Sequence, residues 1–365
     1  MMHYLKNIVS KKWVKLTGAI ILSFIVVIVY SLIFFQYTCT QESTATKQEP
    51  GVITDYLRPE ENTYLTFPEW YIVYSAVEYA DTTEEKRPSD FLYDKAIGQF
   101  WQGYCQIYTY TDSHYEINFN YNLPIMVIGF SFTFENIAKG AYEKTIGWFF
   151  ELFSKQPTQE EIYAQKVAKE YGNFLYVKPF YEFPFGKKLV GLWTNTSTFD
   201  SGFIRKIERK MFLSAEYGVR AFYGKIILML TRAKYGVAQT QIKLTITNAT
   251  QDVFEDTRII KINQTGDDSY IIEMPRYKEF TEIVPWLASK GIEFVDIAGN
   301  DEILITVLVP KNNEYTQEGK VLFTMDVLSE SQNKRVGVIV PVHALGETLV
   351  NMQENNITIE HLYDY

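Results

Sequence analysis

The stretch from Leu16 to Phe35 restricts the fold of this chain more than any other part of its sequence. It reads LTGAIILSFIVVIVYSLIFF, and no charged residue occurs between Lys15 and Glu42. A helix rises ~1.5 Å per residue, so about 20 apolar residues span the ~30 Å hydrocarbon core of a bilayer. Lipid offers no hydrogen bonds, and a helix satisfies its backbone groups within one segment. The sequence therefore predicts a transmembrane anchor over residues 16–36.

The distribution of basic residues predicts the orientation of this anchor. Four lysines precede it (Lys6, Lys11, Lys12 and Lys15), whereas Lys47 is the one basic residue that follows closely. Because basic flanks stay in the cytoplasm, residues 1–15 should be cytoplasmic and the rest exported. The Lys-, Ile-, Tyr- and Asn-rich composition is typical of bacteria, so we expect a single-pass inner-membrane protein with its bulk in the periplasm. The alternative is a cleaved signal peptide, since small residues follow the apolar run.

Composition restricts the exported part. Residues 37–62 are polar and contain Pro50, Gly51 and Pro59, which indicates a linker. The remainder is long enough for two domains, and 47% hydrophobic residues indicate a globular chain. Aromatic residues make up 16% of the sequence, which favours an aromatic core or an aromatic-lined pocket. The net charge of −9 argues against binding nucleic acid.

Residues 63–236 form the first predicted domain, which is helical and rich in aromatic residues. Thr66 with Glu69, and Thr158 with Glu161, match the capping-box pattern at two helix starts. An apolar stripe from residue 123 to residue 152 predicts one long helix, although interfacial immersion of residues 123–134 is an alternative. The sequence also places Glu135, Lys139 and Glu143 at i,i+4 spacing, as for ion pairs along that helix.

The segment from residue 203 to residue 233 predicts a basic amphipathic helix. Its apolar positions recur every three or four residues: Ile204, Ile207, Met211, Ala215, Gly218, Phe222, Ile226 and Met229. Its polar side carries Arg205, Lys206, Arg209 and Lys210 in a protein of negative net charge. Such a face binds anionic headgroups or an acidic partner; the alternative is a solvated face whose charges pair with acidic neighbours. Trp70 and Tyr71, in the string FPEWY, are further binding candidates.

Residues 237–365 form the second predicted domain, in which the apolar pattern alternates as in strands. A helix that follows Pro275 should end at Gly291, and Gly299-Asn300-Asp301 has the composition of a hairpin turn. Two β-α-β passages joined by hairpins predict an α+β fold with an open sheet backed by helices, which could be ferredoxin-like. The two passages share an order of elements but no repeat of residues.

Sequence motifs give little support for metal, cofactor or disulfide chemistry. Cys39 and Cys105 form neither a disulfide framework nor a zinc spacing, so we expect no bridge between them. If the C-terminal segment is a strand, Glu360 and Asp364 lie on one face and His361 on the other. These three residues therefore should not share a metal, and we expect no metal site and no cofactor.

Two functional hypotheses remain. The first is a non-enzymatic binding or assembly component of the cell envelope, which binds a partner protein or an anionic lipid surface beside its anchor. The second is an anchored two-carboxylate hydrolase that uses Glu69 with Glu208 or Glu216 in an aromatic-lined cleft. A ligand sensor is disfavoured because residues 1–15 are too few for a cytoplasmic output domain. The absence of nucleophile and phosphate-loop motifs favours the first hypothesis.

Overall fold

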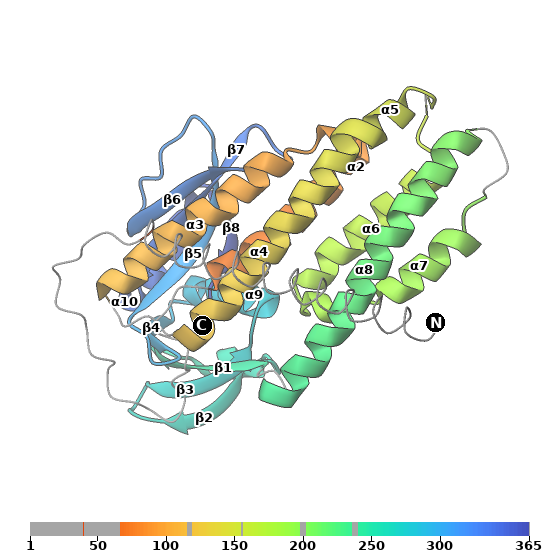
Figure 1. The fold of residues 1–365 in the computed structure, drawn as a ribbon. Coiled ribbons are helices and arrows are strands. Elements are labelled where there is room, and N and C mark those ends of the chain that lie inside the picture. The colour runs from red at the N-terminus through yellow and green to blue at the C-terminus, as the bar shows by residue number, and fades with distance from the viewer. Residues whose placement is uncertain are drawn as a thin grey trace.

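A computed structural model describes residue 39 and residues 66–114, 119–154, 156–197, 202–235 and 240–364 (Figure 1). The predicted anchor at residues 16–36 lies outside these residues, as does the linker apart from Cys39, so both stay predictions. Among the residues that are described, no helix is both long enough and apolar enough to cross a bilayer. The described chain is α+β, with helices followed by two four-stranded antiparallel sheets, which confirms the predicted class.

Helices make up the described chain as far as Tyr235. They are α2 (Phe67–Glu85), α3 (Tyr93–His114), α4 (Phe119–Tyr142), α5 (Trp148–Glu151), α6 (Gln159–Leu175), α7 (Phe185–Thr194) and α8 (Phe203–Tyr235). A π-helical turn, Glu143–Gly147, continues α4 directly into α5, so the single long helix predicted from the apolar stripe is present. The predicted domain boundary after residue 236 falls among residues 236–239, which are outside the described part.

The two predicted capping boxes have different outcomes. At the start of α6, the backbone N–H of Glu161 donates to Thr158 Oγ1 (3.3 Å), and that of Thr158 donates to Glu161 Oε2 (2.7 Å). At the start of α2, Thr66 makes no such hydrogen bond because its backbone is already helical, with φ −69° and ψ −25°. An N-cap needs an extended backbone to turn its side chain onto the first turn. The first prediction is confirmed and the second is wrong.

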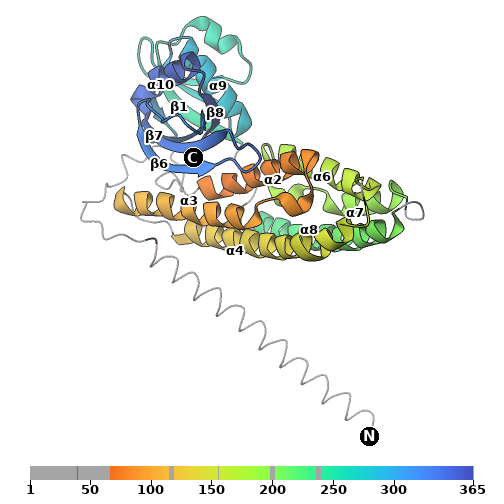
Figure 2. The same ribbon diagram turned by 90° about the horizontal axis from the view of Figure 1, so that it is seen from above.

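Helices α4 and α8 lie side by side and antiparallel (Figures 1 and 2). Charged contacts join them: Lys139 Nζ lies 2.9 Å from Glu216 Oε1, and Arg209 Nη2 lies 2.7 Å from Glu143 Oε1. The residue numbers of the partners decrease along α8 as those on α4 increase, as antiparallel packing requires. The predicted i,i+4 pairs along α4 are thus replaced by pairs between helices. Seen from above, α4 and α8 lie on the side of the helical layer that faces away from the sheets (Figure 2).

The remaining chain forms two units with the same topology. The first unit contains β1 (Gln241–Thr247), β2 (Ile260–Gln264), β3 (Tyr270–Pro275), α9 (Lys278–Ser289) and β4 (Glu293–Ile297). The second unit contains β5 (Glu302–Pro310), β6 (Lys320–Asp326), β7 (Asn333–Pro341), α10 (Val342–Glu354) and β8 (Thr358–Leu362). The strand orders are β2-β3-β1-β4 and β6-β7-β5-β8. Both units are therefore β-β-β-α-β with the last strand beside the first.

Details of the two units also coincide. The pairing of β1 with β4 shifts after Thr245, and the pairing of β5 with β8 shifts after Thr306. The helix ends at a residue of positive φ in both units, Gly291 (77°) and Asn356 (54°). Gly291 confirms the predicted helix terminus, because glycine adopts this conformation without steric cost. The two units thus have the same irregularities at corresponding positions, although the residues at those positions mostly differ.

Two predictions about the sheets are wrong. The strands on either side of Gly299 do not form a hairpin, because β4 and β5 belong to different sheets and residues 298–301 connect them. The two β-α-β passages likewise lie in separate sheets instead of one open sheet. Turn composition predicts a change of direction, but it does not say whether the strands that it joins will pair.

One apolar core joins helices α2, α3 and α4 to both sheets. At its centre the rings of Phe67 (α2) and Phe323 (β6) lie 4.3 Å apart. Glycines make room for both rings: a Cβ would lie 2.3 Å from the Phe67 ring at Gly103, and 2.2 Å from the Phe323 ring at Gly337. A larger side chain at either position would displace the ring that it contacts and disturb the pair of rings at this junction.

A buried ion-pair network also crosses this junction. Arg335 of β7 lies 2.9 Å from Glu78 of α2 through Nη2, and 2.6 Å from Glu360 of β8 through Nε. The Arg335 guanidinium also lies over the Tyr74 ring, 4.1 Å from its centroid. The arginine therefore connects the helical layer to two strands of the second sheet.

Cys39 and Cys105 form a disulfide, which corrects the expectation that they would not pair. The bridge fixes residue 39 against α3, and the Thr109 hydroxyl donates a hydrogen bond to the Cys39 carbonyl. The two cysteines are separated by 66 residues, so sequence spacing could not show their proximity.

Candidate functional site

Helix α8 is amphipathic as predicted, but its orientation is the reverse of the expected one. Arg205, Lys206, Arg209 and Lys210 are all buried. Between Phe203 and Met229, every exposed position other than Lys225 is apolar. The prediction that the basic side of this helix meets solvent or an anionic surface is therefore wrong. The charges point into the helical layer, where carboxylates from other helices surround them.

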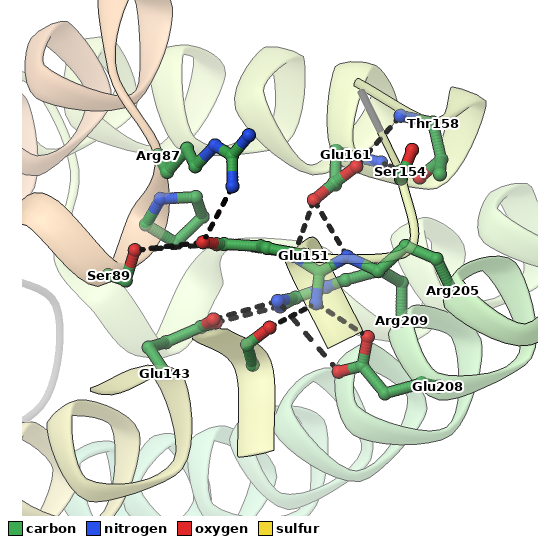
Figure 3. Close-up of polar contacts among 12 residues, drawn as sticks. Arg87, Ser89, Glu143, Glu151, Ser154, Thr158, Glu161, Arg205, Glu208 and Arg209 are labelled. Atoms are coloured by element: carbon green, nitrogen blue, oxygen red, sulfur yellow. Dashed lines mark hydrogen bonds and ion pairs between the residues drawn. The ribbon is translucent and has the colours of Figure 1, made fainter. Parts of the chain in front are cut away.

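Arg205 is the centre of the buried charged cluster (Figure 3). Its guanidinium lies 2.6 Å from Glu161, 2.8 Å from Glu208 and 3.4 Å from Glu151. Its Nη1 also donates to the carbonyl of Gly147 in the π-helical turn (2.8 Å). Glu161 is at once the capping residue of α6 and a partner of Arg205, so the cluster fixes the start of that helix.

Arg209 forms a two-pronged pair with Glu143, the first residue of the π-helical turn. Nη1 and Nη2 of Arg209 each lie 2.7 Å from a Glu143 oxygen. A π-turn inserts one residue into a helix and rotates the following side chains, and such turns are frequent at functional sites. Here the turn directs Glu143 inward while Trp148 and Phe149, just beyond it, are exposed.

The cluster has an excess of negative charge when all its groups are ionised. Arg87, Arg205 and Arg209 supply three positive charges, and Glu143, Glu151, Glu161 and Glu208 supply four negative charges. Burial raises the pKa of Glu143 to about 7 and outweighs the opposing effect of Arg209. A proton on Glu143 would balance the charges of the cluster, so Glu143 is the group that titrates near neutral pH.

A cavity of about 220 Å³ adjoins the cluster. It is lined by Tyr79, Arg87, Glu151, Glu161 and Arg205, among others. The arginines that reach it are already paired with carboxylates, so an anion entering the cavity would have to break those pairs. The geometry suits a structural ion-pair network better than an anion-binding site.

The remaining charged candidates of α8 are also buried and paired. Lys206 Nζ donates to the carbonyl of Ser197 (3.1 Å), and Lys210 Nζ donates to that of Thr196 (3.0 Å). Burial alone would raise the pKa of Glu216, but Lys139 and Arg220 outweigh it and lower that pKa to about 2. A carboxyl that stays ionised at neutral pH cannot donate a proton, which removes the basis for Glu216 as a catalytic acid.

The outer side of the helical layer presents a large apolar surface, which we call the apolar face. It comprises Phe134, Ile137, Trp148, Phe149 and Leu152 of α4, α5 and the following turn, and Ile204, Met211, Val219, Phe222 and Met229 of α8. Phe134, Met211 and Phe222 are 71%, 66% and 69% exposed. Between the two helices lies an apolar groove of about 450 Å³ lined by Phe150, Ile207 and Met211. Contiguous exposed apolar surface is a feature of interaction sites, so the apolar face is the second candidate site.

The candidates on α2 do not join the charged cluster. Glu69 is exposed in the first turn, whereas Trp70 and Tyr71 are buried. The Trp70 ring stacks on His361 with centroids 3.6 Å apart, and the Tyr71 hydroxyl donates to Gln99 (2.9 Å). Trp70 therefore belongs to the contact between the helical layer and the second sheet, whereas Tyr71 packs within the helical layer against Phe100 and Phe132.

The C-terminal acidic and histidine residues have separate partners. Glu360 pairs with Arg335, Asp364 pairs with Arg276 (2.8 Å), and His361 Nδ1 lies 2.9 Å from Thr281 Oγ1. The described residues contain no group of three or more His, Cys, Asp or Glu side chains placed to hold a metal ion.

Comparisons with protein families, curated proteins and solved structures find no match to this chain. Sequence reasoning identified Arg205, Arg209 and Glu208 but missed Glu143, Glu151 and Glu161 as their partners. The capping pattern was the one signal near Glu161, and nothing local connected any of these carboxylates to α8. The apolar positions of α8 were also identified, but not their exposure.

Proposed function

We propose that this protein is a membrane-anchored, non-enzymatic binding component of the cell envelope that docks through its apolar face. The observation that carries the proposal is the reversed orientation of α8, with its charges inside and its apolar positions outside. A soluble domain normally places such residues the other way round, because burying charge is costly and burying apolar area is favourable. This arrangement is energetically favourable when another surface covers the exposed apolar side chains of α8.

Two further features support an exported, anchored location. The predicted orientation of residues 16–36 places the bulk of the chain in the periplasm. The Cys39–Cys105 disulfide suits an oxidising compartment and is rare in the cytoplasm. The finer description of residues 237–365 as a ferredoxin-like domain also stays a proposal.

The hydrolase hypothesis has less support. Glu208 accepts hydrogen bonds from Arg205 and Tyr142, and Glu216 is paired with Lys139 and Arg220. These carboxylates lie inside the helical layer and are engaged by cations. Glu69, Glu208 and Glu216 line three different cavities, so the three glutamates do not form one catalytic site.

Chemical labelling in native membranes tests whether the apolar face is covered. We expect Phe222→Cys to react slowly with a water-soluble maleimide in intact membranes and rapidly after detergent extraction. Val295→Cys is the matched control, because Val295 is an exposed apolar residue on β4 of the first sheet. It should react equally fast in both conditions. Rapid labelling of position 222 in intact membranes would refute the proposal.

A further inference from the structure

We propose that the partner of the apolar face is the lipid bilayer that the predicted anchor crosses, so that α4 and α8 lie in its interfacial layer. This inference rests on the proposed function and names the partner of the same surface. It follows from the position of Cys39, the packing of α3 on α4, and the chemistry of the exposed side chains.

The disulfide places α3 close to the end of the apolar run. That run ends at Phe35, and Cys39 is held on α3 by its bridge to Cys105 and by the hydrogen bond from Thr109. Four residue steps reach at most about 14 Å, whatever their conformation. The headgroup layer extends the bilayer by roughly 5–8 Å on each side of the hydrocarbon. Residue 105 is therefore restricted to the immediate surface of the bilayer.

Helix α4 packs directly on α3 and is therefore at the same surface. The Trp101 indole N–H donates to Thr133 Oγ1 (2.9 Å), and the Tyr104 hydroxyl donates to Asn122 Oδ1 (2.8 Å). Helices α4 and α8, which carry the apolar face, lie on the side of the helical layer away from the two sheets (Figure 2). When this face meets the bilayer, the sheets point away from it into the aqueous compartment.

The chemistry of the face favours lipid over a protein partner. A specific protein interface has about one hydrogen bond per 100–200 Å² and needs polar groups to form them. Among the exposed positions of α8 from Phe203 to Met229, Lys225 is the single polar side chain. Trp148, Phe149 and Phe222 are exposed aromatic side chains, which favour the boundary between headgroups and acyl chains. The basic cluster of α8 from Arg205 to Lys210, which an acidic protein partner would recognise, is buried.

Fluorescence quenching in vesicles tests this inference. Full-length Phe134→Cys, Phe222→Cys and Val295→Cys proteins are labelled with a polarity-sensitive fluorophore under non-reducing conditions, which keep the native disulfide. Each is reconstituted into phosphatidylcholine–phosphatidylglycerol vesicles with or without doxyl-labelled acyl chains. We expect doxyl lipid to lower the fluorescence at positions 134 and 222 roughly twofold or more, and to leave position 295 unchanged.

Iodide in the aqueous phase separates the other outcomes. If positions 134 and 222 are shielded from iodide but not quenched by doxyl lipid, a second copy of the chain covers the face in these vesicles. The lipid inference is then overturned while the proposed docking function survives. If iodide quenches positions 134, 222 and 295 equally, the face is bare and both proposals fail. Circular dichroism of each variant confirms that its fold is retained.

Discussion

Replacement of Arg335 by methionine should strongly destabilise the junction between the helical layer and the second sheet. The Arg335 side chain is 2% exposed, and its partners Glu78 and Glu360 are 4% and 11% exposed. Methionine fills similar space but leaves two buried carboxylates without their cation. Breaking a buried pair from one side costs about 3–5 kcal/mol, which is a large part of the stability of a domain.

The destabilisation by Arg335→Met should depend on pH. Burial raises the pKa of Glu78 although Arg335 opposes it, so removing the arginine raises that pKa further. A carboxyl whose pKa is higher in the folded state than in the unfolded state stabilises the folded protein when it is protonated. This contribution is fully present below the unfolded-state pKa, and it is lost as the pH rises through the folded-state pKa. Relative to wild type, the variant should therefore lose more stability at pH 8 than at pH 5. The difference between the two losses should be about 1.4 kcal/mol for each unit by which the pKa of Glu78 rises.

Urea unfolding of the purified full-length protein in detergent, followed by circular dichroism, measures these differences. Adding Glu78→Gln and Glu360→Gln to Arg335→Met should restore most of the stability, because neutral groups of similar size replace the unpaired charges. Lys169→Met is the control, since it breaks an ion pair with Glu84 that is half exposed and should cost about 0–1 kcal/mol. An Arg335→Met protein within about 1 kcal/mol of wild type at pH 8 would refute the reasoning.

Three further predictions can be checked by the same unfolding measurement. Gly337→Ala should destabilise by about 1–3 kcal/mol because its Cβ meets the Phe323 ring, whereas Gly98→Ala, with open space around it, should be neutral or slightly stabilising. The raised pKa of Glu143 predicts that stability falls by up to about 3 kcal/mol from pH 4.5 to pH 7; Glu143→Gln should abolish this slope, and an unchanged slope would contradict the assignment. Cys105→Ser should lower the free energy of unfolding by roughly 2–4 kcal/mol, and an unchanged urea midpoint would show that the disulfide does not stabilise the fold.

Local signals in the sequence were reliable where a feature depends on a few neighbouring residues. The Thr158–Glu161 cap, the helix end at Gly291 and the long helix through residues 123–152 are all present. Thr66 shows the limit of such a signal, because a helical backbone at that position removes the geometry that a cap requires. The capping pattern identifies the residues that can form a cap, but the backbone conformation decides whether their hydrogen bonds form.

The repetition of the β-β-β-α-β unit is an example of a feature that residues alone conceal. Thr245 and Thr306 occupy equivalent places, but most other equivalent positions have different side chains, as Gly291 and Asn356 do. Strand pairing requires a backbone and an apolar inner face, and many side chains satisfy both conditions. The shared strand order therefore becomes visible only when the pairing is known.

The charged cluster depends still more on distant contacts. Glu143 and Glu151 come from the long helix that ends with α5, and Glu161 comes from α6. Their common feature is proximity to Arg205 or Arg209 on α8. The periodicity of α8 correctly separated its charged side from its apolar side. It could not decide which side faces inward, because a helical period gives the angle between two faces and says nothing about their surroundings.

The order of residues alone was sufficient for the helix periods, the alternation of the strands, the α+β class and the apolar run that predicts an anchor. These properties arise from neighbours within a few positions of one another. Packing alone decided that Cys39 meets Cys105, that α8 turns its charges inward, and that Phe134 and Phe222 are exposed. Those outcomes depend on which surfaces the fold brings together. A long chain can place two residues in contact although nothing in the sequence between them indicates that contact.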